Sequence, residues 1–179
     1  MVVPEGQATA MTATLGDILL VFLADRSGTA HELQQRHAAT FGPQRAVGVN
    51  RVVAALNRQE KLGHIHLLKG ATQKSPQVCA PTEAGRLRQR AWILEVPPEP
   101  DLAEVLDRVL LAMAAADRAT FEAVVERCLA ALDASRPRRR ARAVVSAPHA
   151  LAEYDDVVAA SLRKWLRGLA GRPRDRDAA

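Results

Sequence analysis

The chain has 179 residues, of which 48% are hydrophobic, so it holds enough apolar side chains for a core and too many for a disordered protein. Only 3% of the residues are aromatic, whereas 34 are alanine. This composition excludes a typical β-sandwich and favours helices packed through small and aliphatic side chains. We therefore expect a mostly α protein.

Charge is distributed unevenly along the chain. Residues 91–135 carry three basic and nine acidic groups, whereas residues 42–90 carry nine basic and two acidic groups and contain no Phe, Tyr or Trp. Proteins that bind single strands stack bases on aromatic side chains, so the basic stretch favours contact with a duplex groove. The alternative interpretation is a solvated basic face without a ligand.

The longest apolar runs, 18–24 and 109–116, are too short to cross a membrane. The first residues have neither the basic nor the apolar region of a secretory signal, so we expect no membrane association and a cytoplasmic location. Cys79 and Cys128 are accordingly expected to be reduced.

Two helices are predicted first. Residues at helical spacing indicate a helix over about 13–24: Leu15, Ile18, Leu19, Phe22 and Leu23. Thr29 and Glu32 then form a capping-box pattern that starts a second helix, which reaches Thr40 or Phe41 before Gly42-Pro43.

A third helix follows and ends at Gly63. Its apolar residues have offsets 0, 3, 4 and 7 and predict the buried face: Val49, Val52, Val53 and Leu56. The opposite face is a row of amide and cationic groups interrupted by one small residue: Asn50, Arg51, Ala54, Asn57, Arg58 and Lys61. Arg can bind guanine, Asn can bind adenine and Lys can bind phosphate, so this face suits a major-groove helix.

A short antiparallel hairpin is expected next. Residues 64–68 and 77–80 flank a polar tip that carries Lys69 and Lys74 and could lie along a phosphate backbone. A fourth helix, capped by Thr82, runs to about 94. His64, His66 and Cys79 could together bind Zn²⁺ or Ni²⁺, but no fourth ligand is evident, so ordinary hairpin residues are the alternative.

These elements predict a winged helix-turn-helix domain over 13–95, in which the second and third helices form the helix-turn-helix pair. The expected partner is double-stranded DNA. The residues expected to contact it are Arg45, Asn50, Arg51, Asn57, Arg58, Lys61, Lys69 and Lys74.

Only helices are predicted after the Pro-rich segment 97–100. Asp101 and Asp117 stand at N-cap positions before the apolar stripes of 102–113 and 121–132. A last helix, about 149–169, places apolar residues on one face: Leu151, Tyr154, Val158, Leu162, Trp165 and Leu169. Three such helices do not easily enclose a core, so we expect a helical dimerisation and effector domain over 101–170 and a homodimer.

Two further features leave alternatives open, the tryptophans and a basic run. Trp92 and Trp165 could line a pocket for a small aromatic or drug-like effector, or could simply pack in the core or interface. The basic run 136–142 could contact phosphate or be an exposed loop. No nucleophile and base pair, phosphate loop or paired carboxylates stand out, so we expect no enzyme, cofactor or metal.

Several of these segments, in this order, resemble the PadR family of bacterial transcriptional regulators. They are Ile18-Leu19-Leu20 with 28–33, Ala55-Leu56-Asn57-Arg58 to Gly63, Thr82-Glu83-Ala84-Gly85, Trp92 before 97–100, and Trp165-Leu166. The resemblance covers about 14–170. It implies a homodimeric repressor that releases DNA when a small molecule binds near the dimer interface.

The chain departs from the family pattern in the third helix and in the hairpin. Arg51-Val52-Val53-Ala54 replaces Ser-Ile-Tyr-Pro, so the family's DNA-contacting tyrosine is missing and Arg51 is the candidate replacement. Ser75-Pro76-Gln77 replaces a basic Arg-Pro-Arg, and Cys79 replaces a tyrosine. The alternative functions are a winged-helix protein-interaction module and a small-molecule sequestering protein.

Overall fold

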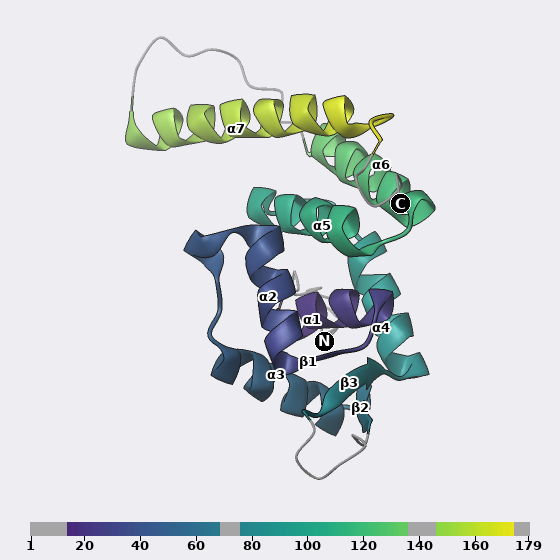
Figure 1. The fold of residues 1–179 in the computed structure, drawn as a ribbon. Helices are drawn as coiled ribbons and strands as arrows, with labels where there is room; N and C mark the ends of the chain where they lie inside the picture. The colour runs from purple at the N-terminus through teal and green to yellow at the C-terminus, as the bar shows by residue number, and fades with distance from the viewer. Residues whose placement is uncertain (1–13, 69–75, 136–145, 174–179) are drawn as a thin grey trace, which may run out of the picture.

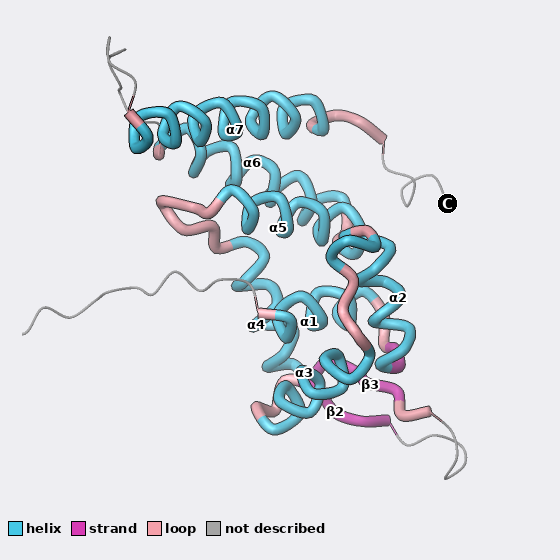
Figure 2. Tube along the Cα trace, turned by 90° about the vertical axis from the view of Figure 1, so that its left-hand side faces the viewer, coloured by secondary structure: helices cyan, strands magenta, loops and turns pink. Residues whose placement is uncertain are grey.

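The computed structural model describes residues 14–68, 76–135 and 146–173, and these form a mostly helical fold with a small antiparallel sheet of three strands (Figures 1 and 2). In chain order the elements are α1 (Leu15–Asp25), β1 (Gly28–Thr29), α2 (Ala30–Phe41), the 3₁₀ turn η1 (Pro43–Arg45), α3 (Val49–Lys61), β2 (Ile65–Leu68), β3 (Val78–Pro81), α4 (Glu83–Leu94), α5 (Leu102–Ala115), α6 (Arg118–Ala134) and α7 (Ala147–Leu169).

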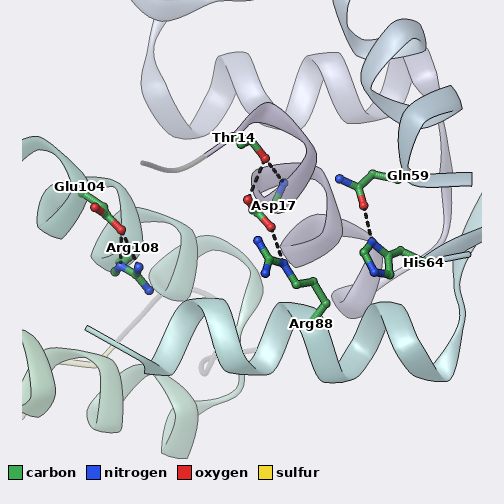
Figure 3. Close-up of polar contacts among 7 residues, drawn as sticks. All are labelled: Thr14, Asp17, Gln59, His64, Arg88, Glu104 and Arg108. Atoms are coloured by element: carbon green, nitrogen blue, oxygen red, sulfur yellow. Dashed lines mark hydrogen bonds and ion pairs between the residues drawn. The ribbon is translucent and has the colours of Figure 1, made fainter. Parts of the chain in front are cut away.

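α1 is the central helix of the fold. All residues from Gly16 to Leu23 are buried, because α3, α4, α5 and β3 pack around this helix. A helix that is apolar on most sides is expected at such a position. Asp17 is buried as well, and its carboxylate accepts from Arg88 Nε of α4 at 3.0 Å and from Thr14 Oγ1 at 2.7 Å (Figure 3). These bonds satisfy the buried carboxylate and join α1 to α4.

The predicted capping box at the start of α2 is confirmed. Thr29 Oγ1 accepts from the Glu32 amide, and Glu32 Oε2 accepts from the Thr29 amide at 2.7 Å. The residues just before α2 also form a strand that the sequence analysis missed, with Gly28 opposite Cys79 and Thr29 opposite Val78. A strand of two residues is too short to show any alternation, which is why it could not be predicted.

The hairpin and the fourth helix lie where they were expected. β2 and β3 pair antiparallel, with Ile65 opposite Pro81 and Leu68 opposite Val78. Thr82 caps α4 by accepting from the Gly85 amide at 3.1 Å. A Cβ at Gly85 would overlap the carbonyl oxygen of His64, so only glycine lets α4 begin this close to β2. The described residues end at Leu68 and resume at Pro76, so Lys69 and Lys74 lie outside them, as does the run 136–142.

α5 packs against both groups of helices. Asp101 and Asp117 cap α5 and α6 as predicted, by accepting from the amides of Ala103 and Thr120. α5 contacts α1 and α2 on one side and α6 and α7 on the other, so the buried apolar residues of the described segments form one cluster. The two segments expected from the sequence, 13–95 and 101–170, therefore share a core.

α7 differs from its predicted orientation. It extends past α5 and α6 (Figure 1), and Leu166, which was not placed on the apolar stripe, is its buried residue. Leu162, Trp165 and Leu169 pack partly against the core and Val158 is half-buried, but Leu151 and Tyr154 are each more than 60% exposed, as is Val157, which was not on the predicted stripe. The stripe is therefore covered only in the C-terminal half of the helix. Among the described helices, none is long and apolar enough to cross a membrane.

Candidate nucleic-acid interface

The predicted polar face of α3 is exposed along its whole length. Six side chains make up this face and all are solvent-exposed: Asn50, Arg51, Ala54, Asn57, Arg58 and Lys61. Within the described segments, none of the three cations on it forms an ion pair, and no side chain covers them. We name these six residues the α3 face. It presents two amides and three positive charges that are free to bind an external partner.

The buried side of α3 is narrower than predicted. Val52 and Leu56 are buried as expected, but Val49 and Val53 are about 40% exposed, and Gln59 takes their place at offset 7 from Val52. Gln59 packs against Gly16 of α1, where a Cβ would collide with its amide nitrogen. The expectation that Val49 and Val53 are buried was wrong, because the gap left by Gly16 admits a longer polar side chain.

A hydrogen bond makes the buried position of Gln59 possible. Its Oε1 lies 2.7 Å from Nδ1 of His64, the residue that leads into β2 (Figure 3). A buried amide without such a partner would be costly. The contact therefore fixes both the rotation of α3 about its axis and the start of the hairpin beside it.

The hairpin lies next to the α3 face. Helix α3 packs on β2, and both views show α3 and the sheet together at one end of the molecule, away from α6 and α7 (Figures 1 and 2). The acidic stretch 91–135, which includes α5 and α6, is thus separated from the basic end.

Arg45 lies at the end of η1, before α3, and its guanidinium binds other groups of the protein although 46% of its side chain is exposed. Its Nη1 and Nη2 donate to Oδ1 and Oδ2 of Asp107 in α5, each at 2.6 Å. Its guanidinium also lies 4.6 Å from the centre of the Phe41 ring. Both carboxylate oxygens are used, and the hydrogen bond with Asp107 raises the pKa of Arg45. Arg45 therefore differs from the cations of the α3 face, because it has an ion-pair partner within the protein.

The possible metal ligands do not come together. His66 is exposed and lies opposite Ala80, whereas Cys79 is buried and lies opposite Leu67. His64 is engaged by Gln59. No group of three His, Cys, Asp or Glu side chains that could hold a metal occurs in the described parts of the chain. Both cysteines are free and buried, and burial raises the pKa of the Cys128 thiol to about 11.

Trp92 is a core residue of α4. It is 5% exposed, and the guanidinium of Arg108 lies 4.5 Å from the centre of its ring. Arg108 is itself buried and donates to Oε1 of Glu104, one turn earlier in α5 (Figure 3). Trp92 therefore packs against a buried ion pair, which agrees with the packing alternative for this residue.

Trp92 and Trp165 line neither of two pockets formed by the described residues. A pocket of about 460 Å³ lies between α5, α6 and α7, and one of about 390 Å³ lies beside α1, α4 and the start of α6. Neither of these two pockets is lined by a tryptophan. The larger one is lined by Leu102, Leu132, Ala152 and Ala159 and by three aspartates.

Several buried residues were not identified from the sequence, because they are charged or polar and hydropathy patterns single out apolar residues. Asp17, Gln59, Glu104, Asp107 and Arg108 are all buried, and each has a hydrogen-bond partner. Only the Glu104 and Arg108 pair carries a local signal, the spacing of four residues.

Searches of family models and of curated proteins found no match for this chain.

Proposed function

We propose that this protein is a dimeric, sequence-specific binder of double-stranded DNA that regulates transcription, as a ligand-responsive repressor like those of the PadR family. The observation that carries the proposal is the exposed and unpaired α3 face. Its side-chain types match the donors and acceptors of the major groove, where Arg binds guanine and Asn binds adenine. The exposed methyl groups of Val49 and Val53 add apolar surface suited to the methyl group of thymine.

The arrangement around α3 supports a winged helix-turn-helix interpretation. α2 and α3 are consecutive packed helices, and the β2–β3 hairpin lies beside α3, where a wing would reach the adjacent backbone. The strand β1 completes the small sheet from the start of α2. Phosphate contacts from Arg58 and Lys61 would set the register on the duplex, and contacts from Asn50, Arg51 and Asn57 would select the sequence.

The homodimer in this proposal is supported by the uncovered half of α7. Leu151, Tyr154 and Val157 lie together within two turns and are exposed, although large apolar side chains on one helix face are normally covered. A second copy would cover them and place two α3 helices on one duplex. The ligand-responsive part of the proposal rests on the family resemblance, since neither described pocket contains Trp92 or Trp165.

The proposal is tested by fluorescence anisotropy with the duplex upstream of the protein's own gene and a scrambled duplex of the same length. We expect the upstream duplex to bind more tightly and its affinity to fall steeply with salt, as bound counterions are released. Arg51→Ala with Arg58→Ala should weaken specific binding by about 2 kcal/mol or more, because both side chains reach the duplex.

A matched control removes two cations from the opposite end of the molecule. Lys164→Ala with Arg172→Ala changes the net charge equally, at exposed positions on and after α7. Its affinity should stay near that of the wild type. If both double variants lost the same affinity, the α3 face would contribute only through its net positive charge. Failure to bind any fragment of the locus at low salt would refute the proposal.

A further inference from the structure

The segment that leads into α3 is largely exposed. None of the residues of η1 is buried, and from Pro43 to Arg51 only Val47 is half-buried. The N-cap residue of α3 is Gly48, which has no side chain to cap the helix, and the amides of Arg51 and Val52 bond to the Gly48 carbonyl. The first turn of α3 therefore depends on whatever holds the preceding residues in place.

Arg45 supplies one part of that hold, beside the packing of Val47 on the core and of η1 on α2. It ends η1, three residues before Gly48, and its guanidinium meets Asp107 in a two-point ion pair with both distances at 2.6 Å. The Asp107 side chain is 11% exposed and the Arg45 side chain 46% exposed, so the pair lies at the edge of the core with its carboxylate side shielded from solvent. Such a planar contact fixes orientation as well as distance.

Aromatic side chains at the end of α2 hold the Arg45 side chain from the other side. Phe41 lies under the guanidinium at 4.6 Å, and the ring of buried His37 lies 4.7 Å from the Phe41 ring. The end of α2, the η1 turn and the middle of α5 thus meet at Arg45. Residues 62 positions apart in sequence are joined at this point.

We propose that Asp107 positions α3 for DNA binding by holding η1 through Arg45, so that Arg45 is a positioning residue and not a DNA contact. This inference rests on the proposed function for its DNA readout. Because Asp107 belongs to α5, any displacement of α5 is passed on to the first turn of α3. The α5–α7 segment thereby gains a direct mechanical link to the DNA-contacting face.

The direction in which one substitution changes the affinity for DNA separates this positioning role from a purely electrostatic effect. Asp107→Asn removes a negative charge, which on charge alone would strengthen binding to DNA. Positioning predicts the opposite, a loss of affinity for the upstream duplex of about 2- to 30-fold, the range that coupling residues show. Glu122→Gln removes the same charge at an exposed site on α6 and should cause no loss.

Further variants make the test independent of charge. Arg45→Gln and the double variant Arg45→Gln with Asp107→Asn should weaken binding as much as Asp107→Asn, without a change in the salt dependence. The double variant leaves no unpaired carboxylate, so it keeps the test valid if a single variant fails to fold. If Asp107→Asn bound DNA as tightly as the wild type or more tightly, or if Arg45→Gln alone lowered the salt dependence, the proposal would be refuted.

A second readout needs no DNA. Hydrogen exchange at the amides of Arg51 and Val52 should be faster in Asp107→Asn than in the wild type, and unchanged in Glu122→Gln. Unaltered exchange in Asp107→Asn would overturn the proposed link. Absence of DNA binding by the wild type would count against the proposed function alone, because the exchange measurement reports on the Arg45 and Asp107 contact in either case.

Discussion

Helices α3 and α7 both leave one face uncovered, but the chemistry of the two faces is opposite. α3 buries Val52, Leu56 and Gln59 and exposes amides and cations, whereas the first half of α7 exposes Leu151, Tyr154 and Val157. An exposed polar face needs no partner for folding, and an exposed apolar face is costly until it is covered. Under the proposed function, the two faces would serve two partners, a duplex at α3 and a second copy of the chain at α7.

The largest expected effect concerns the buried anchor of α3. Leu56→Ala should lower the free energy of unfolding by about 2–5 kcal/mol, because the side chain is 4% exposed and its removal leaves a cavity. Leu151→Ala is the matched control at an exposed leucine of α7, and should change monomer stability by about 0.5 kcal/mol or less. Urea denaturation under conditions that keep the protein monomeric measures both. Similar losses of unfolding free energy in the two variants would contradict the burial of Leu56 in α3 and the exposure of Leu151 in α7.

The next effect separates the two kinds of contact within the α3 face. Arg51→Ala should cost about 1–3 kcal/mol of binding free energy and reduce the preference for the upstream duplex over the scrambled one. Lys61→Ala should weaken binding to both duplexes alike and lower the salt dependence by about one counterion. Anisotropy titrations at several salt concentrations give both quantities. Identical behaviour of the two variants would contradict the division into base and phosphate contacts.

A smaller effect is expected at α7. Leu151→Ser with Tyr154→Ser should raise the dissociation constant of self-association about tenfold, because side chains that a second copy would bury become polar. The helix content of the monomer should not change, since both residues are exposed. Sedimentation over a concentration range tests this. An unchanged dissociation constant would mean that a second copy of the chain does not cover this half of α7.

The smallest effect is a pH dependence at His37, beside the Arg45 contact. Burial, together with the nearby Arg45 charge, lowers the pKa of His37 below its ordinary value of 6.5, so folding favours the neutral ring. The stability that this contributes is present above pH 6.5 and is lost as the pH falls through the lowered pKa. His37→Leu should therefore show a flatter decline of stability between pH 7 and pH 5 than the wild type in urea denaturation, and an equal decline would contradict this assignment.

Helix boundaries were predictable because local signals determine them. The capping box of Thr29 and Glu32 and the caps at Thr82, Asp101 and Asp117 mark starts that the structure confirms. The rotation of each helix was less predictable. Hydropathy favours apolar residues for the buried face, so Val53 was placed inside and the burial of the polar Gln59 and of the charged Asp107 could not be inferred.

The candidate site was predictable in part for the same reason. The α3 face follows from spacing within one helix, and all six of its residues are exposed as expected. Arg45 was grouped with them because it is a cation near α3, but its partner Asp107 is 62 residues away in the sequence. Periodicity carries no information about such pairs, and only the packing of α5 against α2 brings the two side chains together.

The central claim, that α3 reads a duplex as part of a dimer, is tested most directly by hydroxyl-radical footprinting of the DNA upstream of the protein's own gene. We predict two protected segments whose centres are about one helical turn, roughly 10 base pairs, apart, and their loss in Arg51→Ala with Arg58→Ala but not in Lys164→Ala with Arg172→Ala. Uniform protection, or none at concentrations where the wild type is dimeric, would contradict the account.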